Sequence, residues 1–288
     1  MVFTQAISFV HAISRADDQS IQQPLPFIDQ PTDKAVPARA RSVKRDGKRY
    51  LQDILWSESL LAVEVSLACQ TVAELIARLH EKLPQNSGVT RRRNTSIILG
   101  RFFPTDDLDQ LPRRVFQAYD DEALLAAVMR VLFLEAEPVV GELVARRIHG
   151  LPAGSMLPRD FFARFTEEVL GKKEAHVSYR CCTGARVLGW TIVEKKKSYV
   201  AQQIPDETAA LLIFHSRYAP TPRVIDLKFL FTEPTWKYLG FGHEDAVRQF
   251  MRKLEGRGLL NRYATVDRLE QVTTKYPLAS LLQRKVRV

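Results

Sequence analysis

One stretch of the sequence decides the fold of the C-terminal part: Gly242-His-Glu-Asp-Ala-Val-Arg-Gln-Phe-Met-Arg-Lys-Leu-Glu-Gly-Arg-Gly-Leu-Leu-Asn-Arg-Tyr263. Its apolar residues recur every three or four positions, which predicts a helix with one buried face. Glu244 and Asp245 stand in the first turn, where carboxylates suit the helix dipole. Gly256 and Gly258 can end the helix and turn the chain. The residues of the buried face are Val247, Phe250, Met251 and Leu254.

This helix belongs to a longer pattern, from Asp206 to Thr273, that favours a winged helix-turn-helix. Two short strands, Leu259–Tyr263 and Leu269–Thr273, follow the helix, and the polar turn between them would be the wing. Three elements precede it, in the order helix, short element, helix. They are a helix that begins at Asp206, a strand or helix over Arg223–Phe231, and a short helix within Thr232–Gly240. Residues 206–288 are therefore predicted to form a winged helix-turn-helix with a small β-hairpin.

The excess positive charge lies in the same half of the chain. The 288 residues include 42 Lys and Arg and 33 Asp and Glu, a formal net charge of +9. From Gly171 to the end there are 21 basic and 11 acidic residues, or +10, which leaves −1 for residues 1–170. A basic half beside a neutral one indicates a polyanionic partner, and nucleic acid suits the predicted fold. The alternative is a solvated basic surface that aids solubility.

The predicted helix and wing supply the candidate DNA contacts. Arg248 and Arg252 are one turn apart, so both could reach base edges or phosphates from one groove. Arg262 and Arg268 flank the wing and would contact phosphate or the minor groove. Phosphate contacts would dominate the affinity, so binding should weaken steeply with salt. The expected DNA-binding residues of this half are Arg248, Arg252, Lys253, Arg257, Arg262 and Arg268.

A second basic cluster, Arg91, Arg92 and Arg93, stands near the start of a predicted helix in the N-terminal half. Three consecutive helical residues point in different directions, so at most two can share a face. The cluster could anchor a phosphate backbone. It could equally be a solvated helix start with intramolecular ion pairs.

Three regions precede the winged segment. Residues 1–50 are punctuated by proline and end in basic residues, which predicts a flexible, basic-ended tail. Residues 51–170 carry a net charge of −4 and show helical periodicity with short connections, which predicts a compact helical bundle. Residues 171–205 are β-branched and aromatic around Val187–Glu194, which favours a linking segment with β character. The predicted fold class is mainly α, a helical bundle followed by the winged domain.

The expected helices of the bundle follow from apolar spacing and from the prolines and capping residues between them. Ser57 is a plausible N-cap of the first. The others are expected over Thr71–Leu83, Thr90–Phe103, Leu111–Tyr119, Glu122–Leu134, Pro138–Ile148 and Arg159–Leu170.

Several classes of function are disfavoured. Cys69, Cys181 and Cys182 have no paired spacing, which argues against a zinc site or a disulfide framework and suits a reducing, cytoplasmic setting. No apolar run approaches the roughly 18–20 residues that span a bilayer, and the N-terminus lacks the basic start of a signal peptide. There is no glycine-rich phosphate loop, GxSxG or HExxH, and the six histidines are not at ligand spacing. No cofactor, metal or membrane partner is therefore expected.

One pattern could be enzymatic. Glu194 and Lys196 follow a predicted strand, and Glu-x-Lys resembles part of the metal-dependent nuclease core of the PD-(D/E)xK type. That core needs an Asp on an adjoining strand, and the nearest upstream candidate, Asp160, stands at a predicted helix start.

The order of features resembles the BrxA family of bacterial BREX phage-exclusion systems. The resemblance rests on Trp56-Ser-Glu-Ser-Leu-Leu, on Thr90-Arg-Arg-Arg-Asn-Thr-Ser-Ile-Ile-Leu-Gly-Arg-Phe, and on a C-terminal winged segment that closes on Gly258-Leu-Leu-Asn. It covers residues 56–275 and implies a helical, NusB-like N-terminal region, a winged C-terminal region and double-stranded DNA binding without catalysis. The chain differs in its 50-residue N-terminal extension and its basic stretch around Lys195–Lys197.

The sequence thus favours a non-enzymatic protein that binds double-stranded DNA, an accessory factor in a bacterial phage-defence system with other proteins as partners. Three alternatives stay open at this point. They are a transcriptional regulator or plasmid replication initiator, a metal-dependent nuclease, and an RNA-binding antiterminator-like protein.

Overall fold

The chain is mainly helical, with two small antiparallel sheets, over the residues that this computed structural model describes: 52–105, 107–266 and 269–288. These residues belong to one compact unit of the chain, residues 40–288. The predicted tail, residues 1–50, and Arg268, a predicted DNA contact, lie outside the described residues. None of the helices within the described ranges combines the length and the apolar character that crossing a bilayer requires.

Four helices open the described chain: α1 (Trp56–Ser66), α2 (Val72–Lys82), α3 (Gly88–Phe102) and α4 (Leu111–Tyr119). Local signals set most of their bounds. The Thr71 hydroxyl accepts a hydrogen bond from the backbone N–H of Glu74 at 3.1 Å and caps α2. The predicted N-cap at Ser57 is wrong, because α1 begins at Trp56 after a left-handed Leu55 at φ 49°. The Trp56 ring packs edge-on against Phe133, a tertiary contact that local sequence does not reveal.

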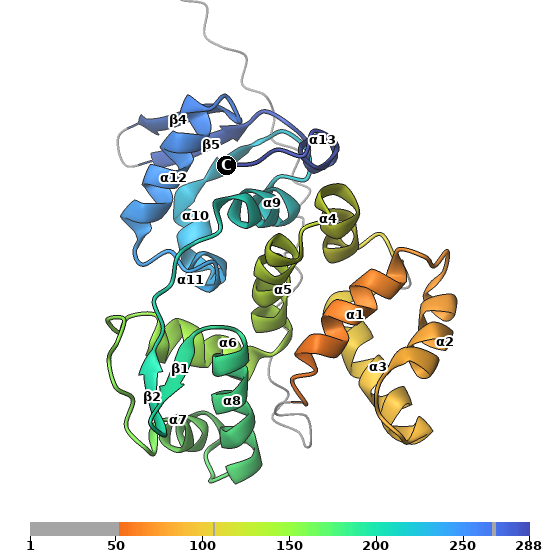
Figure 1. Cartoon of the computed structure of the whole chain (residues 1–288). Helices are drawn as coiled ribbons and strands as arrows, with labels where there is room; N and C mark the ends of the chain where they lie inside the picture. The colour runs from red at the N-terminus through yellow and green to blue at the C-terminus, as the bar shows by residue number, and fades with distance from the viewer. Residues whose placement is uncertain (1–51, 106, 267–268) are drawn as a thin grey trace, which may run out of the picture. The chain divides into compact units, whose positions relative to one another are not determined.

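The next helix, α5 (Glu122–Ala136), is the centre of the packing (Figure 1). It is apolar on nearly all sides, which is typical of a helix with neighbours all round. Asp121 caps its start by accepting from the Leu124 N–H at 3.0 Å. It contacts α3 and α4 and three elements that come later in the chain, namely α6 (Pro138–Leu143), α9 (Glu207–Tyr218) and α11 (Thr235–Tyr238).

A buried ion pair joins the first helices to α6. The Arg101 guanidinium donates to the Glu137 carboxylate at 2.8 Å and to the Ile54 carbonyl at 2.8 Å, and it lies 4.7 Å from the centre of the Phe133 ring. Burial raises the pKa of Glu137, although the adjacent Arg101 charge lowers it. The pair ties three distant segments together, and each partner depends on the other because an unpaired buried charge is costly.

The region after α6 contains both helices and a β-hairpin. α6 runs into a π-helical turn, η1 (Val144–Ile148), and is followed by α7 (Phe161–Leu170), α8 (Ala175–Val187), β1 (Thr191–Glu194) and β2 (Lys197–Val200). The sequence predicted β character for this linking segment around Val187–Glu194; β1 and β2 lie there, and the helix α8, which was not predicted, precedes them. Val177, Cys181 and Ala185 are spaced four apart and are fully buried where α8 packs on α6 and α7. This burial of residues on one face stabilises α8 as a helix.

The hairpin that follows α8 is a separate two-stranded sheet. β1 and β2 pair from Thr191 opposite Val200 to Glu194 opposite Lys197. An isolated bridge from Met156 to Tyr199 holds β2 against the segment before α7.

The last region contains α9, β3 (Val224–Asp226), α10 (Leu227–Thr232), α11, α12 (Glu244–Gly256), β4 (Leu260–Val266), β5 (Leu269–Thr274) and α13 (Leu278–Gln283). Its three strands form an antiparallel sheet in the order β3-β5-β4. Asp206 caps α9 by accepting from the Ala209 N–H at 2.8 Å. Ile225 and Val272 face the helices and are buried, so the sheet covers the core with one of its faces.

Candidate nucleic-acid interface

Helix α12 is amphipathic and its apolar face is fixed in the core. Val247, Phe250, Met251 and Leu254 are all at most 4% exposed, as their spacing predicted. The His243 ring caps the helix, since its Nδ1 accepts from the Ala246 N–H at 3.1 Å. α12 packs directly on β4. The residues on its outer side are Glu244, Asp245, Gln249, Arg252, Lys253 and Gly256.

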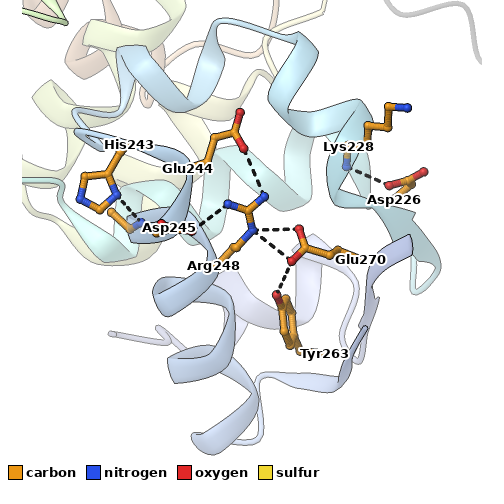
Figure 2. Close-up of polar contacts among 9 residues, drawn as sticks. Asp226, Lys228, His243, Glu244, Asp245, Arg248, Tyr263 and Glu270 are labelled. Atoms are coloured by element: carbon orange, nitrogen blue, oxygen red, sulfur yellow. Dashed lines mark hydrogen bonds and ion pairs between the residues drawn. The ribbon is translucent and has the colours of Figure 1, made fainter. Parts of the chain in front are cut away.

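Arg248 is held by three carboxylates (Figure 2). Its Nε donates to both carboxylate oxygens of Glu270 on β5, at 2.8 and 3.1 Å. Its Nη1 donates to Asp245 at 2.9 Å and its Nη2 to Glu244 at 3.1 Å. These hydrogen bonds raise the pKa of the guanidinium above its ordinary value. The guanidinium carbon also lies 4.8 Å from the centre of the Phe231 ring, which covers one of its faces.

Tyr263 extends this network to β4. Its hydroxyl donates to Glu270 at 3.2 Å (Figure 2). Its backbone N–H donates to Glu255 of α12 at 2.9 Å. The predicted DNA contact Arg248 is therefore a cross-link between α12 and the β4–β5 hairpin. The sequence pattern indicated the position of Arg248 on the helix but not its partners, because Glu270 is 22 residues away.

Two other predicted DNA-binding residues of α12, Arg252 and Lys253, differ in whether they form an ion pair. Arg252 is exposed, and its guanidinium lies 5.2 Å from the centre of the Tyr263 ring without an acidic partner among the described residues. The ammonium of Lys253 forms an ion pair with Glu207 at the start of α9. Arg252 is thus available to an anion, whereas Lys253 would first have to leave Glu207.

Arg257 and Arg262 are exposed, and neither side chain forms an ion pair with any residue in the described ranges. Arg262 on β4 stands opposite Thr273, which in turn stands opposite Val224 on β3. Paired residues of an antiparallel sheet share a face, and Val224 is 53% exposed. Arg262 therefore points from the solvent-facing side of the sheet, away from the side on which Tyr263 meets α12.

The cluster Arg91, Arg92 and Arg93 is divided by its helical geometry. Arg91 donates to the His80 carbonyl at 2.6 Å, and Arg93 pairs with Asp53 at 3.0 Å. Arg92 is exposed and has no ion-pair partner in the described part of the chain. Intramolecular pairing thus accounts for two of the three, which was the alternative that the sequence left open.

The nuclease-like pattern lies in the β1–β2 hairpin. Glu194 ends β1 and Lys196 stands in the turn, while the adjoining strand, Lys197–Val200, contains no carboxylate. Asp160 precedes α7 and pairs with Arg164 at 2.8 Å. No group of three His, Cys, Asp or Glu side chains that could hold a metal ion occurs among the described residues.

A groove of about 710 Å³ lies beside α12, between the start of α9 and the C-terminal residues. Lys253 and Gln249 of α12 line one wall, and Asp206 and Glu207 line the other. The carboxylates of Asp206 and Glu207 make this groove a poor phosphate site. The predicted DNA-binding arginines of this half that have no acidic partner among the described residues lie elsewhere, at the C-terminal end of α12 and on the β4–β5 hairpin. No signal in the sequence indicated this groove, because its walls come from separate segments.

Comparison of the chain with protein-family models, with curated proteins and with solved structures found no match.

Proposed function

We propose that this chain binds double-stranded DNA through a winged helix-turn-helix formed by residues 206–288, with no catalytic step of its own. The observation that carries the proposal is the order of elements together with the order of strands. A helix, a short strand, two short helices, a longer helix and a hairpin follow one another, and the first strand pairs with the last to give β3-β5-β4. In this proposal α12 is the helix that enters the major groove and β4–β5 is the wing.

The exposed cations support DNA contacts from two places, the C-terminal end of α12 and the solvent-facing side of the β4–β5 hairpin. Arg252 and Arg257 extend from that end, and Arg262 extends from the wing. We assign phosphate contacts to these three arginines, because none has an acidic partner within the described residues. Arg248 instead holds the helix on the hairpin, and its contribution to binding is to orient α12.

The helical region before residue 171 is proposed as a docking platform for other proteins. Its net charge of −4 over residues 51–170 disfavours phosphate binding over the whole surface. The resemblance to the BrxA family supports a role as an accessory factor in bacterial phage defence.

Fluorescence anisotropy with a random duplex of about 30 base pairs, at several salt concentrations between about 50 and 200 mM, tests the proposal. We expect a slope of log affinity against log salt of about −3 or steeper, since each phosphate contact contributes about −0.9. Replacing Arg252, Arg257 and Arg262 together by Ala should reduce the magnitude of the slope by about 2 to 3. The charge-matched control replaces Arg78, Arg114 and Arg164 by Ala, which removes three surface arginines from α2, α4 and α7.

A wild-type slope near zero would exclude DNA binding of this kind. An equal loss in the control variant would mean that net charge, and not this surface, sets the affinity. Competition with a structured RNA separates the alternative of an RNA-binding protein, which requires the RNA to displace the duplex at equal concentration.

A further inference from the structure

The turn between β1 and β2 is built from two lysines in a backbone conformation that disfavours them. Lys195 and Lys196 have φ values of 48° and 65°, and Glu194 pairs with Lys197 on either side of them. A two-residue hairpin with both central residues at positive φ prefers Asn followed by Gly, since side chains with a Cβ are crowded there. The tip therefore carries long cationic side chains at positions where folding alone favours small ones. Strained residues of this kind concentrate where a surface has a function.

The charge of the C-terminal half is concentrated in this part of the chain. Residues 171–203 contain 7 basic and 2 acidic residues, or +5, whereas residues 206–288 contain 14 basic and 9 acidic residues, also +5. The shorter segment thus carries the same excess in less than half the length. The sequence prediction counted the excess over the whole half from Gly171 to the end, without dividing it between these two segments.

The cations of the hairpin tip form fewer ion pairs than Arg248 and Lys253 of α12. Lys195, Lys196 and Lys197 are exposed, and no ion pair joins them to any residue of the described ranges. In contrast, the charges of Arg248 and Lys253 are balanced by carboxylates. The hairpin itself packs against α8 through β1 (Figure 1).

We propose that the tip of the β1–β2 hairpin, Lys195, Lys196 and Lys197, is a second contact for the phosphate backbone of a nucleic acid, separate from α12 and its wing. Lysine is a compact charge on a flexible stem, which suits non-specific phosphate contacts better than base recognition. The inference rests on the proposed DNA binding, because a second weak contact on the same polyanion gains from the local concentration that the first creates. Nucleic acid is favoured over an anionic membrane for this reason, because the α12 surface is proposed to bind the same polyanion.

The test uses the full chain and two matched variants of the hairpin. One replaces Lys195, Lys196 and Lys197 by Gln, and the other replaces the same three residues by Arg, which keeps the charge. Anisotropy with a duplex of about 30 base pairs should give the Gln variant a salt slope smaller in magnitude by about 2 to 3, with affinity at least about tenfold weaker at low salt. The Arg variant should keep the wild-type slope. Thermal melts of both variants check that the fold is retained.

The outcomes separate this inference from the proposed function. A wild-type protein without salt-dependent DNA binding contradicts both. If wild-type DNA affinity falls steeply with salt and the Gln variant has the same salt slope, the hairpin contact is wrong. The proposed DNA contacts of α12 are not affected by that result. Sedimentation of the wild-type protein and the Gln variant with phosphatidylserine vesicles tests whether the tip binds lipid instead. If the Gln substitutions abolish vesicle binding but leave DNA binding unchanged, the tip is a lipid contact and the inference is wrong.

Discussion

Arg248 of α12 and Glu270 of β5 form a two-point contact, in which one nitrogen, Nε, donates to both carboxylate oxygens at 2.8 and 3.1 Å. Both side chains are about one-quarter exposed, at 23% and 25%, so the contact is partly shielded from water. It links a helix to a strand on the far side of the hairpin turn. The angle between α12 and the hairpin therefore depends on a polar contact as well as on apolar packing.

Glu270→Gln is expected to lower stability and to weaken DNA binding. The substitution removes one charge of the network and should cost about 1 kcal/mol of unfolding free energy, less than a fully buried charged hydrogen bond because the pair is partly solvated. It should also loosen the orientation of α12 on the hairpin, which weakens DNA binding and makes the salt slope shallower. Urea unfolding and anisotropy measure the two effects. Glu81→Gln removes one carboxylate from an exposed position of α2 and is the control for the lost charge. A Glu270→Gln variant with wild-type stability and slope would contradict the assigned role.

The buried pair of Arg101 and Glu137 should show strong coupling in a double-mutant cycle. Glu137→Leu leaves a buried guanidinium unpaired and is expected to cost about 3–5 kcal/mol. The double variant Arg101→Met with Glu137→Leu should lose much less than the sum of the single variants, because both charges have gone. Chemical denaturation of the four proteins gives the coupling energy. Additive losses would mean that the two side chains act independently.

Gly141→Ala is predicted to destabilise the protein through a steric clash. An added Cβ would lie 2.5 Å from the Leu134 carbonyl oxygen and 2.6 Å from the Tyr238 hydroxyl oxygen, so backbone would have to move. We expect a loss of about 1–3 kcal/mol. Gly100→Ala is the matched control, since a Cβ there meets nothing within 4 Å. That helical substitution should instead add about 0.5–1 kcal/mol, and thermal melts should therefore move in opposite directions.

Stability should fall as the pH is lowered, in part because of His215. The ring is fully buried, its Nδ1 lies 3.0 Å from the Leu211 carbonyl, and burial lowers the pKa of the imidazole. In the unfolded chain the His215 imidazole takes up a proton near its ordinary pKa of about 6.5, whereas in the folded chain it does so only at lower pH. The stability that the neutral ring contributes above pH about 6.5 is therefore lost as the pH falls below that value.

His215→Leu should remove this contribution. Between about pH 7.5 and pH 5.5, the wild-type unfolding free energy should fall more than that of the variant, by up to about 1.4 kcal/mol for each pH unit below 6.5. Some dependence should persist, because burial also lowers the pKa of His149. Urea titrations at several pH values provide the comparison, and identical pH profiles would contradict the assignment.

Replacing the strained turn should make the protein more stable. Lys195→Asn with Lys196→Gly installs the residues that the positive φ values prefer, with an expected gain of about 1 kcal/mol and a rise in Tm of about 2–4 °C. Lys195→Gln with Lys196→Gln removes the same charges without relieving the backbone and is the control. A gain in both variants would attribute the effect to charge repulsion, and not to conformation.

The positions of most helices could be predicted from the sequence, because the signals that set them lie within a few residues of each helix. α4 spans Leu111–Tyr119 as predicted, and α9 and α12 follow Asp206 and the apolar spacing of Val247 to Leu254. Capping, helix-breaking residues and the 3.6-residue period act over one to three turns, so a single sequence reveals them. The mainly α class followed for the same reason.

Tertiary packing decided which of the charged side chains are still available to a ligand. Arg248, Lys253, Arg91 and Arg93 were equivalent to their neighbours in sequence, yet each is engaged by a partner that lies from 3 to 46 residues away. Packing also made α8 a helix, because α6 and α7 bury its residues at helical spacing. The sequence by itself determined where helices begin and how much charge each segment carries, because those properties are local or additive. The fold determined which charges are cancelled, because a salt bridge depends on distances that only the folded chain sets.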